Sequence, residues 1–223
     1  TDGISRPIAP DASVGIVISH FKSPLQDAVR AAQAAEKRAK KLPGKAAVAI
    51  TLLKRSGETV EWATRWDDDG VKAAGTLNQA LRDDIVSAKF PYRLGELISV
   101  YRTQSAPMFA PFPPVNGFDL GEVFARELDT VLARQHGRKW DLGGAQFRDD
   151  FSLQIKGWLA SLLKEPTPAD GEEPPLPDEQ NRLRAKRFNS ALDQMIALFA
   201  FCGFAQRLDR EPAVENQPAP SRP

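Results

Sequence analysis

The chain has very little of the chemistry that builds disulfide frameworks or histidine-based metal sites. Among its 223 residues there is one cysteine, Cys202, and there are two histidines, His20 and His136. A single thiol cannot form an intramolecular disulfide or a zinc cluster, and such sparse use of cysteine is typical of a reducing compartment. The sequence therefore predicts a cytoplasmic protein whose fold depends on a hydrophobic core.

An excess of charge of either sign is also missing. Lys and Arg number 30 and Asp and Glu number 29, which gives a formal net charge of +1. A free-standing nucleic-acid binder usually shows a strong basic excess, so any such contact here must use local basic patches. We also find no signal peptide and expect no apolar run long enough to span a membrane. These features predict a protein that has no membrane partner.

The N-terminal third has the order strand, helix, strand, hairpin. Residues 13–20 carry apolar residues on both sides, which predicts a central strand that is covered on both faces. Ser23-Pro24 then opens a helix, and Pro43-Gly44 ends it. Two further strands, at 46–53 and 59–66, are predicted to form a hairpin with one solvated face.

Beyond the hairpin the pattern changes from strands to helices. Polar turn residues at 67–70 predict a boundary between a sheet-containing part (1–70) and a helical part (71–210). An acidic, proline-rich linker at 165–178 is predicted to be mobile, and the tail 211–223 to be disordered. The expected fold class is α+β. Helices are expected at 76–89, 92–105, 119–136, 145–164 and 179–209.

Four motifs carry a resemblance to a known family. They are 11–20 (DASVGIVISH), 21–25 (FKSPL), 35–41 (AEKRAKK) and 53–58 (LKRSGE). In this order, and followed by a helical region, they resemble the large, cyclase-palm subunit of type III CRISPR effector complexes, in its subtype B (Cmr) form. The resemblance covers residues 11 to about 66, and the helical remainder is similar only in type. A wider resemblance is to the palms of diguanylate cyclases.

The resemblance implies that residues 1–70 are the C-terminal part of a ferredoxin-like palm, followed by an α-helical C-terminal domain. It implies ATP and a divalent metal (Mg or Mn) as cofactors, and synthesis of cyclic oligoadenylates when target RNA binds. The implied partners are other effector subunits, guide RNA and target RNA.

One part of the family pattern is absent. The Gly-Gly-Asp-Asp hairpin that binds the metal in that family does not occur in this chain. We therefore expect the metal ligands outside the chain, on an upstream part of the subunit or on a split partner, and we expect the isolated chain to be inactive. Thr1 stands where an initiator methionine would be, which fits a chain that begins within a domain.

Four residues are candidates for contact with the nucleotide. Lys40 lies where the resemblance implies a phosphate-binding lysine, although a cation at a helix C-terminus also complements the helix dipole. Lys45 is the next candidate. Ser13 and Gly15 lie on the strand that would neighbour the absent hairpin. Glycine there allows a ribose or base to approach closely, or it only lets a helix pack closely.

Two pairs of basic residues are candidates for contact with RNA. Arg184 and Arg187 are expected on one helix face, where they bind RNA phosphates or pair with the acidic linker. Lys54 and Arg55 flank a tight turn, where they are simply exposed or face RNA or a neighbouring subunit. The alternative function is a non-catalytic scaffold of a ribonucleoprotein complex, or a fragment of a diguanylate-cyclase-like palm.

The acidic clusters are not expected to replace the absent hairpin. They lack the glycines that let a hairpin approach phosphates, so we interpret them as solvated surface charge. Trp140 and Trp158 are expected in the core. The acidic clusters are Asp67-Asp68-Asp69, Asp83-Asp84 and Asp149-Asp150.

Overall fold

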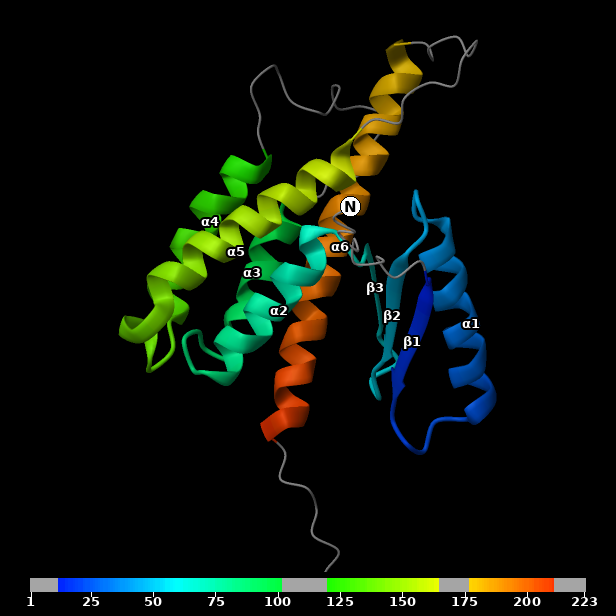
Figure 1. The fold of residues 1–223 in the computed structure, drawn as a ribbon, viewed down its shortest axis with the longest axis horizontal. Helices are drawn as coiled ribbons and strands as arrows, with labels where there is room; N and C mark the ends of the chain where they lie inside the picture. Colours follow the sequence, from blue (N-terminus) through cyan, green and yellow to red (C-terminus); the bar gives the residue numbers. More distant parts are fainter. Residues whose placement is uncertain (1–11, 102–119, 165–176, 211–223) are drawn as a thin grey trace, which may run out of the picture.

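The computed structural model describes residues 12–101, 120–164 and 177–210 (Figure 1). These residues form a small mixed sheet and six helices, which is the expected α+β class. The first helix, α1 (Leu25–Lys41), connects two parallel strands. The sheet has the order β1-β2-β3, and its strands are β1 (Val14–Ser19), β2 (Ala47–Leu53) and β3 (Thr59–Arg65).

Five helices follow the hairpin that β2 and β3 form. The first of them begins at Asp69, inside the polar cluster that was interpreted as a boundary, so the predicted start at residue 76 was wrong. Acidic residues stabilise a helix N-terminus, and the Asp-rich cluster therefore belongs to the start of the helix. The five helices are α2 (Asp69–Arg82), α3 (Phe90–Ser99), α4 (Leu120–Gln135), α5 (Trp140–Leu163) and α6 (Pro177–Arg210).

The two faces of the sheet carry side chains of different size. On one face Ala47 and Ala49 of β2 pack against Ala35 and Ala39 of α1. Alanines let the helix axis lie close to the sheet. The opposite face carries larger apolar side chains that belong to the main core together with α2 and α6. These larger residues include Val48, Ile50, Leu52, Val60 and Trp62.

The sheet and the helices share one continuous core (Figure 1). Trp62 of β3 stacks on Phe201 of α6, with ring centroids 5.8 Å apart, and meets Trp158 of α5 edge-on at 6.4 Å. Trp158 is fully buried, as predicted, and Trp140 is partly buried against the same core. The boundary near residue 70 is thus a change of secondary structure inside one packed core.

The predicted position of β1 in the sheet was wrong. β1 pairs with β2 alone, and among the described residues no strand lies on its other side. Val14 and Ile16 remain 37% and 39% exposed. Alternation along the strand showed that both faces are apolar, but it carries no information on strand order. The strand that is covered on both faces is β2.

Several predictions fall on residues that the structure does not describe. The tail 211–223 and residues 165–176 of the predicted linker lie outside the described residues. Residues 177 and 178, which were assigned to that linker, belong to α6.

Gly15 faces α1 at a point of close contact. A Cβ at this position would lie 2.6 Å from the carbonyl oxygen of Ala32 and would also clash with the backbone nitrogen of Glu36. The helix-packing alternative for Gly15 is therefore confirmed. A nucleotide cannot reach this residue from the α1 side.

Gly15→Ala should lower the free energy of unfolding by about 1–3 kcal/mol, because neither backbone contact can move without shifting α1. Gly75→Ala is the matched control: Gly75 is exposed on α2 with nothing within 4 Å of an added Cβ. The control should gain about 1 kcal/mol from helix propensity. Urea unfolding measures both variants. A Gly15→Ala protein as stable as the parent would contradict the close packing of α1.

Candidate functional site at the open edge of the sheet

The outer edge of β1 is the least protected part of the sheet. An unpaired strand edge presents backbone N–H and C=O groups that accept a further strand. The opposite edge is different, because Gln194 of α6 accepts a hydrogen bond from the Ala63 N–H of β3 at 2.8 Å. Within the described ranges, therefore, only the β1 edge lacks a covering element.

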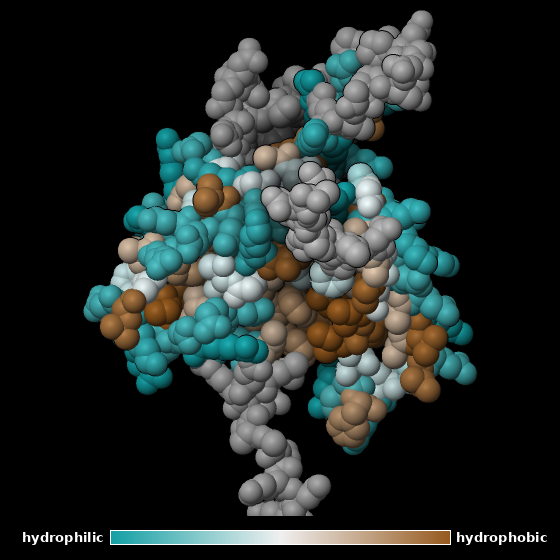
Figure 2. Space-filling view, viewed as in Figure 1, coloured by the Kyte–Doolittle hydropathy of each residue, from teal (hydrophilic) through white to brown (hydrophobic). Residues whose placement is uncertain are grey.

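Apolar side chains border this edge on both faces of the sheet. Val14 and Ile16 align with Val48 and Ile50 of β2 and lie on the face that packs on the helices. Beside α1, Phe21 and Leu25 are 84% and 77% exposed. Hydrophobic surface is visible over the sheet and beside α1 in Figure 2.

This exposure is concentrated at one place. Among the residues that the structure describes, five of the nine exposed large hydrophobic side chains lie along β1, the following turn and the first half of α1. Contiguous apolar surface of this kind marks an interaction site, whereas single exposed apolar residues need no explanation. The five are Val14, Ile16, Phe21, Leu25 and Val29.

Lys40 lies on the side of α1 that borders this edge. Helical spacing places it in line with Leu25, Val29 and Glu36, and the Glu36 backbone packs over Gly15 of β1. The Lys40 Nζ and a Glu36 carboxylate oxygen are 2.6 Å apart. The hydrogen bond from Lys40 holds the pKa of that carboxyl below its usual value. An exposed pair of this type contributes little to stability, so Lys40 can exchange Glu36 for a phosphate at small cost.

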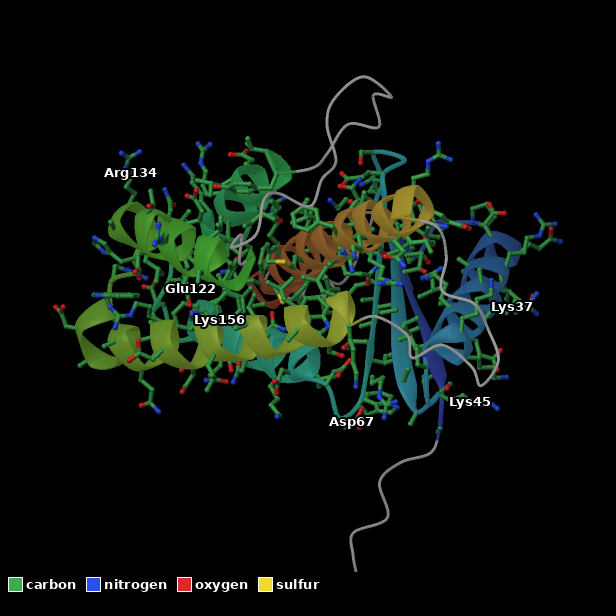
Figure 3. The ribbon with its side chains drawn as sticks, turned by 90° about the horizontal axis from the view of Figure 1, so that it is seen from above. Lys37, Lys45, Asp67, Glu122, Arg134 and Lys156 are labelled. Atoms are coloured by element: carbon green, nitrogen blue, oxygen red, sulfur yellow. The ribbon has the colours of Figure 1, made fainter. Side chains whose placement is uncertain are left out.

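Lys45 is exposed in the loop between α1 and β2, and its backbone is left-handed. Gly44, Lys45 and Ala46 have φ values of 79°, 54° and 44°. Arg65 holds this loop, because its Nη1 donates to the Pro43 carbonyl oxygen at 2.7 Å. Arg65 also pairs with Asp67 at 2.8 Å and so lowers the pKa of that carboxyl. The loop conformation is thus fixed from β3. Figure 3 shows Lys45 on the side of the molecule away from α4 and α5.

Ser13 lies on the same face of β1 as Gly15, next to α1. Its Oγ is buried and has no hydrogen-bond partner among the described residues. A buried hydroxyl without a partner is costly, so this position favours a further polar group at the edge of β1. The structure thus places Ser13 and Lys40 on the two elements that border the open edge.

The RNA candidates lie apart from Lys40 and Lys45. Lys54 pairs with Glu58 at 2.8 Å in the β2–β3 turn, and Arg55 is exposed there. This turn follows the last residue of β2, whereas Lys45 precedes its first residue, so β2 separates them. Arg184 and Arg187 lie on the N-terminal half of α6 and both interact within the molecule.

Arg38, which belongs to the basic run at the C-terminal end of α1, has a structural role. Arg38 donates to Glu61 at 2.7 Å and to the Oγ1 of Thr51 at 2.6 Å. It lies across the α1 face of β2 and β3. The sequence could have predicted this contact, because Arg38 follows the buried Ala35 by three residues. That spacing places both side chains on the same face of the helix.

The described residues contain no group of three or more His, Cys, Asp or Glu side chains that could hold a metal ion. The exposed Asp67 and Asp149 pair with Arg65 and Arg148, which fits solvated charge. Asp84 departs from that prediction: it is 19% exposed and bound to Arg138 at 2.6 Å. Its φ of 59° also places it outside a helix.

The thiol and the most apolar helix belong to the core. Burial raises the pKa of the Cys202 thiol, which is therefore not a nucleophile. Among the described residues one stretch, Arg182–Arg207, has the length and composition of a membrane span, and its 18-residue apolar window has a mean hydropathy of 1.3. The expectation that no run reaches this length was wrong. Half of the apolar window is buried inside the molecule, which explains its composition.

Comparison with known proteins leaves the family open. No protein-family model matches the chain. No curated protein shows significant similarity to it.

Lys45→Gly should raise the free energy of unfolding by about 1 kcal/mol, because glycine adopts the left-handed conformation without steric cost. Lys37→Gly removes the same charge from an ordinary helical position of α1 and should lower stability by about 1 kcal/mol. Urea unfolding at equal ionic strength compares the two. Equal destabilisation by both changes would show that the loop is not left-handed in solution.

Proposed function

We propose that the chain is part of the large subunit of a type III CRISPR RNA-guided effector complex. In this proposal it contributes the C-terminal part of a ferredoxin-like palm that binds ATP and makes cyclic oligoadenylates when target RNA binds. The helices from α2 to α6 contact other subunits and RNA. The observation that carries the proposal is the open edge of β1, with Lys40 beside it.

The four sequence motifs support this proposal through their positions. The first two form β1 and the turn that leads into α1, which together border the open edge. The third is the C-terminal half of α1 and includes Lys40. The fourth forms the β2–β3 turn. Three of the four motifs thus border the same edge of the sheet, where a strand from a partner would pair with β1.

The chain's own contribution would be to position phosphate groups. Phosphoryl transfer depends mainly on positioning and on neutralising charge, and an exposed lysine beside a strand edge supplies both. Lys40 would leave Glu36 and bind a nucleotide phosphate, with Lys45 as a second cation at the same end of α1. Gly15 contributes indirectly, by keeping α1 and therefore Lys40 close to β1.

The metal does not fit the described residues, because they contain no suitable ligand group. In the proposed reaction a ribose 3′-hydroxyl would attack the α-phosphate of a second ATP and release pyrophosphate, and a metal held outside this chain would supply neutralisation of charge there. We therefore assign the metal ligands to the polypeptide that pairs with β1, which is an upstream part of the subunit or a split partner. No step of the reaction is assigned to an acidic residue of this chain.

A second candidate function is a non-catalytic scaffold within a ribonucleoprotein complex. The exposed Phe21 and Leu25 favour it, and so does the lack of a metal-ligand group among the described residues. In that case the β1 edge would still accept a partner, but Lys40 would only complement the helix dipole.

Ile16→Lys tests the strand partner. The tagged chain is purified from its host, and the amount of partner that co-purifies is measured. A charge on β1 should lower that amount at least tenfold, since pairing with a further strand buries both faces of β1. Leu153→Lys is the matched control, because Leu153 is 70% exposed on α5, away from the edge. Co-purification is measured by quantitative mass spectrometry. Equal effects of the two changes would contradict β1 as the docking edge.

Lys40→Ala tests the catalytic role in the complex purified from its host. We expect assembly to persist and the yield of cyclic oligoadenylates, measured by mass spectrometry, to fall at least tenfold. Lys40→Arg should retain part of it, and Lys89→Ala, an exposed lysine before α3, should retain all of it. Unchanged synthesis with Lys40→Ala would leave the scaffold function. Metal-dependent ATP turnover by the isolated chain would contradict the assignment of the metal ligands to a partner.

A further inference from the structure

The edge strand β1 has no built-in protection against pairing with another strand. Its six residues, Val14–Ser19, include no charged residue and no proline, which are the residues that natural sheets commonly use to block an edge. β2 pairs with one side of β1, and no described strand pairs with the other. Every copy of the chain therefore carries the same open template for a further strand.

The side chains of β1 alternate between two faces of different character. The face towards α1 carries mostly small residues: Ser13, Gly15, Val17 and Ser19. The face towards the helical core carries large apolar residues: Val14, Ile16 and Ile18. Antiparallel pairing places directly opposite residues on the same face of a sheet. A two-fold axis through Ile16 would therefore bring the large residues of two copies together on one face and the small residues together on the other.

This register also gives the buried hydroxyl of Ser13 a partner. With Ile16 opposite Ile16 of a second copy, Val14 lies opposite Ile18, and Ser13 lies opposite Ser19. The Ser13 Oγ is buried and has no hydrogen-bond partner among the described residues. Opposite hydroxyl side chains on paired strands form hydrogen bonds. One register thus matches the apolar residues and satisfies Ser13 at the same time.

The helix α1 fits beside a symmetry-related α1. It lies over the space between β1 and β2, because it packs on Gly15 of one strand and on Ala49 of the other (Figure 1). Neighbouring strands are about 4.8 Å apart, so the two helices would lie two strand spacings, or about 10 Å, from each other. That is a normal distance for packed helices. The exposed Leu25 and Val29 lie on the side of α1 that borders this edge and would fill the contact.

The opposite face of the sheet leaves room for a second copy. The helical layer there leaves Val14 and Ile16 exposed, so it does not cover β1. At the rim of the contact, Glu36 and Lys40 form an exposed ion pair. A polar rim around an apolar centre is the usual composition of a protein interface.

We infer that the free chain forms a homodimer by antiparallel pairing of β1 with β1 of a second copy, centred on Ile16. The dimer contains one continuous six-stranded sheet with both α1 helices on the same face. Because a two-fold contact uses the same surface of both copies, it closes and adds no third copy.

The inference goes beyond the proposed function, in which β1 pairs with a different polypeptide. A second copy and that polypeptide would compete for one edge. The dimer would therefore keep the apolar edge covered until the partner displaces the second copy. Only this competition rests on the proposed function.

The first test measures the mass of the purified full chain by sedimentation velocity over a range of protein concentrations. We expect a dimer that dissociates on dilution. Ile16→Lys should weaken the dimer at least tenfold, because it places two like charges directly opposite each other. Leu153→Lys, at an exposed position of α5, is the matched control and should dimerise as the parent does. Unchanged circular dichroism spectra would show that the variants fold.

Ser13→Ala tests the proposed hydrogen bond. It should weaken the dimer about tenfold, because it removes two symmetry-related hydrogen bonds. Adding Ser19→Ala should weaken the dimer little further, since both changes remove the same pair.

A cysteine series tests the register on non-reducing gels after mild oxidation. Ile16→Cys should form an intermolecular disulfide, because directly opposite Cα atoms are about 4.5–5.5 Å apart, within the range for a disulfide. Val14→Cys alone should not, since four residues, or about 13 Å along the strand, separate it from its copy. Val14→Cys combined with Ile18→Cys should cross-link again. The native Cys202 is buried and serves as the unreactive background.

Three results would overturn the inference. A monomer at every concentration would exclude the dimer. Equal weakening by Ile16→Lys and Leu153→Lys would place the contact elsewhere. Equal cross-linking at positions 14 and 16 would indicate parallel stacking or non-specific association.

The proposed function stands or falls separately from the dimer. A monomeric chain whose Ile16→Lys variant loses its strand partner would leave the proposed function intact. A dimeric chain that recovers no strand partner from its host would leave the dimer intact.

Discussion

The burial of β2 on both faces is the constraint on which the rest of the structure depends. One face carries Ala47 and Ala49, and the small side chains let α1 lie close to the sheet. The other face carries Val48, Ile50 and Leu52, which need large partners and find them in the helical core. β2 thus faces both layers, and Trp62 of the neighbouring β3 adds a stacking contact with Phe201 of α6. The close approach of α1 in turn requires glycine at position 15.

The two edges of the sheet differ in a way that has functional consequences. α6 covers β3 and satisfies the Ala63 N–H, while β1 keeps apolar residues exposed at its side. Natural sheets usually protect an edge of this kind, so the β1 edge is a candidate for pairing with a further strand. In the proposed function this explains how a chain without metal ligands in its described part contributes to a nucleotide site. In that proposal the chain would supply the phosphate-binding lysine, and its strand partner would supply the carboxylates.

The basic side chains near the C-terminal end of α1 point in different directions and so make different contacts. Arg38 turns towards the sheet and binds Glu61 and Thr51. Lys40 borders the β1 edge and pairs with Glu36. Lys37 and Lys41 face away from the sheet. A run of basic residues that looks uniform in the sequence therefore contains a structural contact, a candidate nucleotide contact and exposed positive charge.

Local patterns in the sequence determined the three strands to within one residue, the existence of the helices and the burial of Trp158. Hydrophobic periodicity and the Pro-Gly punctuation reflect forces that act within a few residues. The position of β1 at the edge, the contacts of Arg38 and the stacking of Trp62 on Phe201 of α6 were decided only by the tertiary structure. These features depend on which surfaces pack against each other in the whole folded chain. A periodic pattern shows only which side of an element is apolar.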